Sequence, residues 1–272
     1  MQINGSTRIV AVFGDPIAHT ASPAMHNAAF AALGLNWVYV ACRVDPGNLR
    51  RALDGAREMG FAGVNLTVPH KILALEMVDE ADAEARELGA VNTIRFETNG
   101  RLCGFNTDGY GFTQAIAEEF GCAVAGLRVL VLGAGGAGRA LALTCRRAGA
   151  ARVVVANRTV ARLADLPGCE GIALADAPGI LREVDLIVNA TSVGLRPGES
   201  LGIQPGRQHL VYDTIYNPPQ TELLRVARAA GARTANGLGM LLHQGARAFE
   251  LWTGRAAPVE VMRAALRRAV AE

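Results

Sequence analysis

The segment from Val129 to Arg162 constrains this sequence most, because an apolar run leads directly into a glycine-rich turn and then into an alanine-rich helical pattern. Gly133, Gly135 and Gly138 follow the G-x-G-x-x-G spacing. The first glycine of that motif permits a tight turn, the second lets the backbone approach a pyrophosphate, and the third lets the helix pack on the strand. The segment therefore predicts a dinucleotide site at a helix N-terminus. A turn that only packs helix against strand is the alternative.

The end of the next predicted strand, Arg152 to Ala156, indicates which dinucleotide binds. Sites for NAD carry Asp or Glu there, which binds the ribose 2′-hydroxyl. Here the sequence continues without a carboxylate as Asn157-Arg158-Thr159-Val160-Ala161-Arg162. Two guanidinium groups and a hydroxyl suit a 2′-phosphate, because arginine forms forked, charge-assisted hydrogen bonds. We therefore predict NADP, although arginines at such positions are, taken singly, more often solvated.

The composition is that of an ordinary globular protein. The 272 residues suffice for one large domain or two smaller ones. The net charge of only +2 gives no reason to expect a nucleic-acid partner. The sequence has no run of about 18 apolar residues that would span a membrane, and its first residues lack the pattern of an export signal. We therefore predict a cytoplasmic protein without membrane association.

Cysteines and histidines follow no ligand spacing. The five cysteines are scattered and form no C-x-x-C pair, so we expect small buried residues rather than disulfides, zinc ligands or nucleophiles. The five histidines likewise predict no metal site.

Strand-like runs alternate with helical patterns along the whole sequence, which is typical of α/β proteins with mostly parallel sheets. Because the glycine motif begins near the middle, a separate domain precedes it, and we place the boundary near residue 108. In this first part we expect strands at Ile9–Phe13, Val38–Val44 and Gly63–Val68, and helices at Ala24–Leu33, Leu49–Met59 and Ile72–Leu88. Ser22 is the expected N-cap of the first helix, with Pro23 at its first position. Later strands are expected at Asp185–Ala190 and Leu210–Tyr212.

Lys71 and Asp108 are candidates for proton transfer. Lys71 follows Asn65-Leu66-Thr67-Val68-Pro69-His70 at a predicted helix start, where the helix dipole disfavours an ammonium group. Asp108 ends the first domain and would face Lys71. Taken singly, a helix cap is the commoner role for Asp108 and a solvated surface cation is the commoner state of Lys71.

Other polar side chains suit a small, hydroxylated substrate. Thr20 and Ser22 stand at a helix N-terminus, which can bind a carboxylate, although Ser22 would equally cap that helix. Asn92 could bind hydroxyl groups or close a local turn. Gln244 follows Met240 by one helical turn, and a solvated glutamine is the commoner outcome there.

Seven separated motifs, in order over nearly the whole chain, resemble the shikimate dehydrogenase family. They are Gly14 to Pro23, Asn65 to Lys71, Gly89 to Thr93, Asn106 to Gly109, Asn189 to Ser192, Tyr216 to Pro218 and Gly237 to Gln244. The resemblance implies two α/β domains with C-terminal helices that return to the first: a substrate and catalytic domain of residues 1–108 plus 240–272, and a Rossmann NADP domain of residues 109–239.

The resemblance also implies an activity, the reversible NADPH-dependent reduction of 3-dehydroshikimate to shikimate for chorismate and aromatic amino-acid biosynthesis. Lys71 and Asp108 would be catalytic, and Thr20, Ser22, Thr67, Asn92, Asp108, Tyr216 and Gln244 would bind the substrate. The cofactor would contact Gly133, Ala134, Gly135, Gly136, Ala137, Asn157, Arg158, Thr159, Arg162, Thr191, Ser192, Thr214, Gly237 and Met240. No metal is implied, and a homodimer is compatible with the resemblance.

Thr20 departs from the family pattern, in which serine is more common. The added methyl group would lie near the substrate carboxylate and C1, the carbon at which quinate carries an extra hydroxyl. A quinate/shikimate dehydrogenase or an aminoshikimate-type paralogue is therefore an alternative. A non-catalytic NADP-binding sensor is an alternative of another class, and retention of both Lys71 and Asp108 argues against it.

Overall fold

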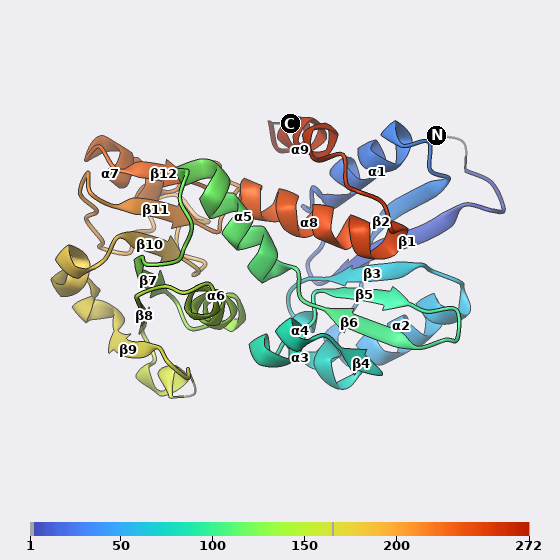
Figure 1. Cartoon of the computed structure of the whole chain (residues 1–272), viewed down its shortest axis with the longest axis horizontal. Coiled ribbons are helices and arrows are strands. Elements are labelled where there is room, and N and C mark those ends of the chain that lie inside the picture. Colours follow the sequence, from blue (N-terminus) through green and yellow to red (C-terminus); the bar gives the residue numbers. More distant parts are fainter. Residues whose placement is uncertain (1–2, 165, 272) are drawn as a thin grey trace. The chain divides into compact units, whose positions relative to one another are not determined.

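A computed structural model of the chain describes residues 3–164 and 166–271 (Figure 1). The chain forms two compact units. The first comprises the residues up to Asp108 and those from Leu242 onward, and the second comprises Gly109–Leu241. Residues 1 and 272, which belong to the predicted substrate domain, lie outside the described residues. Helix α5 (Asp108–Phe120) begins at the first boundary, and helix α8 (Leu238–Thr253) crosses the second.

A six-stranded sheet forms the centre of the first unit. Its elements are β1 (Arg8–Gly14), α1 (Ser22–Ala32), β2 (Trp37–Arg43), α2 (Leu49–Glu58), β3 (Gly63–Leu66), α3 (His70–Leu73), β4 (Glu80–Ala81), α4 (Ala83–Leu88), β5 (Thr93–Phe96), β6 (Leu102–Phe105) and α9 (Val259–Ala271), with 3-10 helices at Pro46–Asn48 and Ala74–Glu76. The strand order is β2-β1-β3-β5-β6-β4. β5 runs antiparallel to both of its neighbours, β3 and β6. A tight turn at Gly100, with a positive φ of 82°, joins β5 directly to β6, as an antiparallel pair allows.

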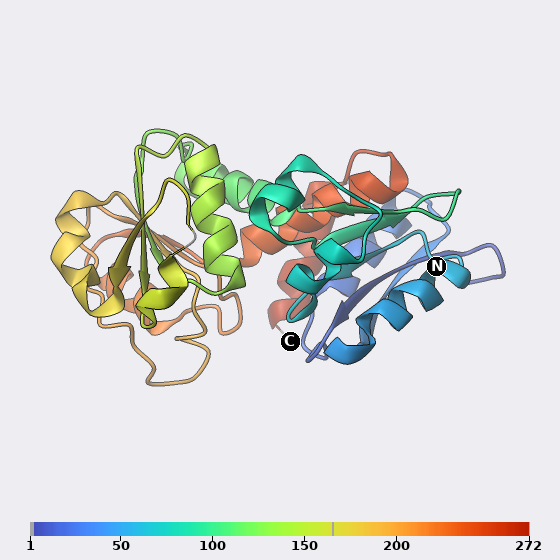
Figure 2. The same ribbon diagram turned by 90° about the horizontal axis from the view of Figure 1, so that it is seen from below.

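Both faces of this sheet are buried, because successive side chains of a strand point to opposite faces. On one face α2 packs through Leu49 and Leu53. On the other, Gly63 leaves room for Trp252 of α8, whose Nε1 donates to the Ile94 carbonyl oxygen at 3.0 Å. Helix α9 packs beside α1 (Figures 1 and 2). The C-terminal helices thus return to the first unit, as the resemblance implied.

The long helix predicted at Ile72–Leu88 is wrong. Asp79 interrupts it, because its N–H donates to the Leu102 carbonyl oxygen at 2.9 Å and its carboxylate accepts from the Leu102 N–H at 2.7 Å. These two bonds draw the chain into β4, beside β6. Asp82 then caps α4 by accepting from the Ala85 N–H at 2.7 Å.

The second unit contains a parallel six-stranded sheet with the order β12-β11-β10-β7-β8-β9. Its elements are β7 (Arg128–Leu132), α6 (Gly136–Arg147), β8 (Arg152–Asn157), β9 (Glu170–Ala173), β10 (Leu186–Asn189), β11 (Leu210–Asp213), α7 (Glu222–Ala229) and β12 (Arg233–Ala235), with 3-10 helices at Val160–Leu163 and Leu174–Glu183. Helix α6 packs on one face of this sheet and α7 on the other; Figure 2 shows α6 beside the strands.

The strand order of the second unit reverses beside β7. From β7 the chain first proceeds to β8 and β9, and then resumes on the other side of β7 with β10, β11 and β12. Open parallel sheets bind nucleotides outside the carboxyl ends of their strands at such a switch point. The predicted Rossmann-type fold is confirmed.

His26 of α1 lies in the interior of the first unit. Its ring is fully buried and stacks on Tyr39, with ring centroids 4.3 Å apart. Neither ring nitrogen has a hydrogen-bond partner among the described residues. Burial therefore lowers the pKa of His26 to about 3.

This pKa makes the stability of the protein depend on pH. The unfolded state binds a proton on His26 below pH about 6.5 and the native state does not until pH about 3, so the free energy of unfolding falls as the pH falls between these values. His26 should contribute a loss of about 2 kcal/mol between pH 6.5 and 5. We expect His26→Phe, which cannot take up a proton, to remove this loss in urea unfolding measured at both pH values. Equal pH dependence in the two proteins would contradict the expectation.

Candidate active site

The topology of the first sheet brings the candidate segments to one edge. β1, β3 and β6 end at Gly14, Leu66 and Phe105, and β5, which runs the other way, begins at Thr93. The segments containing Thr20, Lys71, Asn92 and Asp108 all adjoin these strand ends.

Lys71 and Asp108 are in contact at this edge. The Lys71 Nζ donates to Asp108 Oδ2 at 2.7 Å, and the side chains are 30% and 12% exposed. The other carboxylate oxygen, Oδ1, accepts from the Asn92 Nδ2 at 2.9 Å. The Lys71 main chain is held as well, because its carbonyl oxygen accepts from the Val91 N–H at 2.8 Å. The amine is thus held in one place, with an exposed fraction that leaves it reachable by a small molecule.

Lys71 is also the only lysine of the sequence, whose other 26 cationic Lys and Arg side chains are all arginine. Arginine supplies a cation equally well at a surface, but its guanidinium group does not release a proton in proteins. A chain that uses arginine everywhere else and lysine here therefore favours a role in proton transfer. This composition is a stronger argument than the helix dipole, because α3 spans only four residues.

A buried hydrogen-bond network supports Asp108 from inside the unit. Tyr39 Oη donates to Asn65 Oδ1 at 2.7 Å, and Asn65 Nδ2 donates to Thr93 Oγ1 at 2.9 Å. Thr93 Oγ1 in turn donates to Asn92 Oδ1 at 3.0 Å, and Asn92 reaches Asp108. Tyr39, Asn65 and Thr93 were not predicted as site residues from the sequence, because a polar residue within a strand resembles an ordinary exposed position. Asn65 could have been found from the sequence, because it lies two residues before Thr67 in the motif Asn65 to Lys71.

Thr20 and Ser22 lie together before α1. The Thr20 Oγ1 donates to the Ser22 Oγ at 3.2 Å. The helix begins at Ser22, with Ala21 as its N-cap, so the predicted capping role of Ser22 is wrong. The buried Ser22 hydroxyl instead forms a hydrogen bond with Tyr39. Burial raises the pKa of Tyr39, and the hydrogen bond with Ser22 acts in the opposite direction.

Two further substrate candidates belong to the first unit. Thr67 directly follows β3, and its N–H donates to the Phe13 carbonyl oxygen at 3.0 Å. Gln244 is partly buried on α8 beside Gly245, which packs against Met25 of α1.

The glycine turn of the second unit has the geometry that its spacing predicts. Gly133 has a φ of +103°, which favours glycine. A Cβ atom at Gly138 would lie 2.0 Å from the Gly133 carbonyl oxygen, so this close approach of helix to strand requires glycine. A Cβ at Gly135 would meet nothing within 4 Å, so the space beside the start of α6 is open. Gly136 and Ala137 form the first turn of that helix.

The end of β8 adjoins this turn. Asn157 Oδ1 accepts from the Ala134 N–H at 3.1 Å, and Asn157 Nδ2 donates to the Thr159 carbonyl oxygen at 2.9 Å. Arg158 directly follows this strand and Arg162 lies in the 3-10 helix after it, and both are exposed. An amide that joins the two segments, with exposed guanidinium groups beside it, fits a dinucleotide that carries an adenosine phosphate.

The remaining cofactor candidates follow β10, β11 and β12. Thr191 and Ser192 follow β10, and the Thr191 methyl group lies against Gly133. Thr214 follows β11. The substrate candidate Tyr216 lies in the same loop, and burial raises the pKa of its hydroxyl. The last pair, Gly237 and Met240, lies at the start of α8. The Gly237 N–H donates to the Ile215 carbonyl oxygen at 3.2 Å, and the Met240 N–H donates to the Tyr212 hydroxyl at 3.2 Å.

The expectation that the cysteines are buried holds for Cys145, whereas Cys42, Cys103, Cys122 and Cys169 are only partly buried. All five are free thiols, and burial raises the pKa of Cys145 to about 12. A thiol is a poor nucleophile until it ionises. Within residues 3–164 and 166–271, no three His, Cys, Asp or Glu side chains gather as a metal site would require, and no helix there is long and apolar enough to cross a membrane.

Comparison with known proteins gives matches along the whole chain. Residues 12–94 match the shikimate dehydrogenase substrate binding domain, residues 115–195 the shikimate / quinate 5-dehydrogenase family, and residues 237–267 the shikimate 5′-dehydrogenase C-terminal domain. The NADP(+) shikimate dehydrogenase of Methanopyrus kandleri is 45% identical over 98% of this chain and 97% of that protein.

Comparison with solved structures also gives shikimate dehydrogenases. The structure of a shikimate dehydrogenase in complex with NADP+ has a TM-score of 0.93 and 40% identity, over 100% of this chain and 98% of that one. Shikimate 5-dehydrogenase from Thermus thermophilus, in complex with NADP(H) and shikimate, has a TM-score of 0.87 and 42% identity, over 96% of this chain and 99% of that one.

Proposed function

The chain belongs to the shikimate dehydrogenase family, and we propose that it catalyses the reversible NADPH-dependent reduction of the 3-keto group of 3-dehydroshikimate to shikimate, a step in the biosynthesis of chorismate and aromatic amino acids. The observation that carries this proposal is the 2.7 Å contact between the only lysine of the sequence and Asp108. The Asn92 amide bonds to the same carboxylate, and the paired hydroxyls of Thr20 and Ser22 follow a strand that ends at the same sheet edge, as suits a hydroxylated acid. Because the chain is an oxidoreductase of this family, the sensor alternative is set aside.

In this mechanism Lys71 is the general acid. NADPH held by the second unit would supply the hydride that the carbonyl carbon takes up. The Lys71 ammonium group delivers a proton to the oxygen as negative charge develops there, and the reverse reaction returns the proton to the amine. Asp108 holds the ammonium group through Oδ2, and Asn92 keeps the carboxylate in place through Oδ1. The residues of the first unit thus hold and move one proton.

The roles of Thr20, Ser22, Thr67, Asn92 and Asp108 follow from their place at the same sheet edge as this pair and from the family. The roles of Tyr216 and Gln244 follow from the family alone. Thr20 and Ser22 bind the carboxylate through their paired hydroxyls, while Thr67, Asn92, Asp108, Tyr216 and Gln244 bind the ring hydroxyls. Residues 1–108 plus 240–272 thereby form the substrate and catalytic domain.

Residues 109–239 form the NADP domain in this proposal. The open space at Gly135 takes the pyrophosphate, with Gly133, Ala134, Gly136 and Ala137 around it. Asn157, Arg158, Thr159 and Arg162 take the adenosine phosphate. The nicotinamide would be held by Thr191, Ser192, Thr214, Gly237 and Met240. We also propose that the enzyme works in the cytoplasm, where thiols stay reduced, and that it forms a homodimer, which sedimentation would test.

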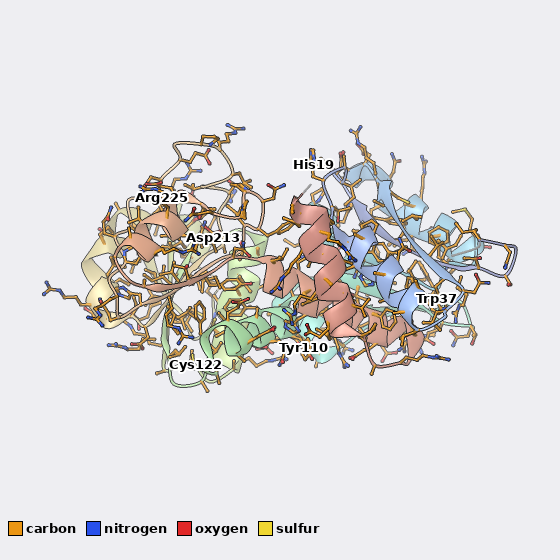
Figure 3. All side chains as sticks on the ribbon, turned by 90° about the horizontal axis from the view of Figure 1, so that it is seen from above. His19, Trp37, Tyr110, Cys122, Asp213 and Arg225 are labelled. Atoms are coloured by element: carbon orange, nitrogen blue, oxygen red, sulfur yellow. The ribbon has the colours of Figure 1, made fainter. Side chains whose placement is uncertain are left out.

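Arg158→Ala tests how the chain selects NADP. Loss of one forked phosphate contact should lower kcat/KM for NADP by about 10–100-fold, equivalent to about 1.4–2.8 kcal/mol, and leave kcat/KM for NAD nearly unchanged. Arg225→Ala is the matched control, because Arg225 is an exposed arginine on α7 that pairs with Glu222 (Figure 3). Equal losses with both cofactors would argue against a contact between Arg158 and the 2′-phosphate.

The activity itself is tested by the absorbance change of NADPH with shikimate and with quinate, each with NADP and with NAD. Turnover of shikimate with NADP supports the proposal. Comparable turnover of quinate would favour the second candidate, a quinate/shikimate dehydrogenase. Two observations support that candidate: the family match of residues 115–195 and the methyl group of Thr20. No turnover with any pair would refute the proposed activity.

A further inference from the structure

Asp213 is a buried carboxylate at the end of β11 that the proposed mechanism does not use (Figure 3). Its Oδ1 accepts from the Ile215 N–H at 3.0 Å, and its Oδ2 accepts from the Thr221 hydroxyl at 2.7 Å. Asn189 Nδ2 donates to both oxygens, at 3.0 and 3.1 Å. Burial raises the pKa of Asp213, and these hydrogen bonds act in the opposite direction. Three donors that converge on one side chain require an acceptor-only group.

Each partner of Asp213 controls a different segment. Asn189 ends β10 and also holds the loop after it, because its Oδ1 accepts from the Thr191 N–H at 3.0 Å and its Nδ2 donates to the Val193 carbonyl oxygen at 3.1 Å. Ile215 belongs to the loop after β11, and Thr221 is the N-cap of α7. One carboxylate therefore ties together two loops and a helix start.

These two loops carry the residues assigned to the nicotinamide end of the cofactor. Thr191 lies between Asn189 and the glycine turn at Gly133. On the second loop, a Cβ atom at Gly237 would lie 2.0 Å from the Thr214 carbonyl oxygen, so the start of α8 rests directly on this loop. Within the described part of the chain, no hydrogen bond of Asp213 joins it to β8, the adenosine end, where Asn157 instead bonds to Ala134 and Thr159.

We propose that Asp213 is a positioning residue that sets the loops after β10 and β11, and so places the nicotinamide of NADPH for hydride transfer without touching it. The proposal rests on the proposed function. It predicts that loss of the network slows hydride transfer while the adenosine end of the site binds as before.

The test compares Asp213→Asn, Thr221→Val and Thr221→Ser with the wild-type protein. The readouts are kcat with shikimate and NADP, and the calorimetric affinities for NADP+ and for 2′,5′-ADP, a fragment that lacks the nicotinamide. Asp213→Asn puts a donor where three donors converge, and Thr221→Val removes one hydroxyl at nearly constant shape. We expect kcat to fall at least tenfold in the first and at least threefold in the second, with 2′,5′-ADP affinity within twofold of wild type. Thr221→Ser keeps the hydroxyl and should restore kcat to within twofold.

Two results would overturn the proposal. One is a kcat within twofold of wild type in both Asp213→Asn and Thr221→Val. The other is a loss of 2′,5′-ADP affinity in step with kcat, which would indicate general damage to the domain. If Asp213→Asn does not fold, the Thr221→Val and Thr221→Ser pair decides. If the wild-type protein turns over no shikimate, the proposed function fails by itself. Positioning is then judged by binding alone: it predicts weaker NADP+ binding with unchanged 2′,5′-ADP binding, and unchanged affinities for both would refute it.

Discussion

Replacing Lys71 by alanine is expected to lower kcat for shikimate oxidation by about 10²–10⁴-fold, the usual contribution of a general acid or base. The affinity for NADP+ should change by less than about twofold, because the glycine turn and the arginines after β8 belong to the other unit. We expect kcat to fall because, without the amine, no group at this position exchanges a proton with the 3-oxygen. Initial rates followed by NADPH absorbance, together with a calorimetric NADP+ titration, measure both quantities.

Lys71→Arg is the control that separates charge from proton transfer. Arginine retains a cation that can pair with Asp108, but its guanidinium group does not release a proton in proteins. We therefore expect Lys71→Arg to be nearly as slow as Lys71→Ala. An arginine variant with more than a tenth of wild-type activity would show that Lys71 acts as a fixed positive charge. An alanine variant within tenfold of wild type would remove it from the chemistry altogether.

The contact between Lys71 and Asp108 could be anticipated although 37 residues separate them. Both follow segments with strong start and end signals, and strand ends of an α/β sheet collect polar side chains. The glycine turn was predictable for a similar reason, because each of its glycines answers a separate steric demand. Backbone geometry restricts the residue type at such positions, so they can be recognised in the sequence.

Features that depend on tertiary contacts were not predictable in this way. The helical period of Ile72–Leu88 gave no sign that Asp79 would pair with Leu102, 23 residues later. Similarly, nothing local distinguishes Thr93 or Asp213 from ordinary strand residues, because Asn65 and Asn189, which donate to them, belong to other strands. Buried polar networks are specified by several distant residues at once, so they become visible only when the fold is known.

Replacing Gly135 by alanine is expected to leave the fold intact and weaken NADP+ binding by about 10–100-fold, equivalent to about 1.4–2.8 kcal/mol. A Cβ at this position meets no protein atom within 4 Å, so the substitution introduces no clash in the protein. Its methyl group would occupy the space where the backbone must approach the pyrophosphate. The free energy of unfolding should fall by less than about 1 kcal/mol, because Gly135 is only the N-cap of α6. Calorimetric titration and urea unfolding measure the two effects.

Gly138→Ala should instead lower the stability of the fold. Its Cβ would lie 2.0 Å from the Gly133 carbonyl oxygen, so the backbone must shift and stability should fall by about 1–3 kcal/mol. Gly55→Ala controls for helix propensity: Gly55 lies inside α2 with open space around it, and alanine there should stabilise by about 0.5–1 kcal/mol. If Gly135→Ala bound NADP+ like the wild type, the pyrophosphate could not lie against this turn. A stable Gly138→Ala protein would mean that the close packing of α6 on β7 can relax, and that the third glycine is not required by the fold.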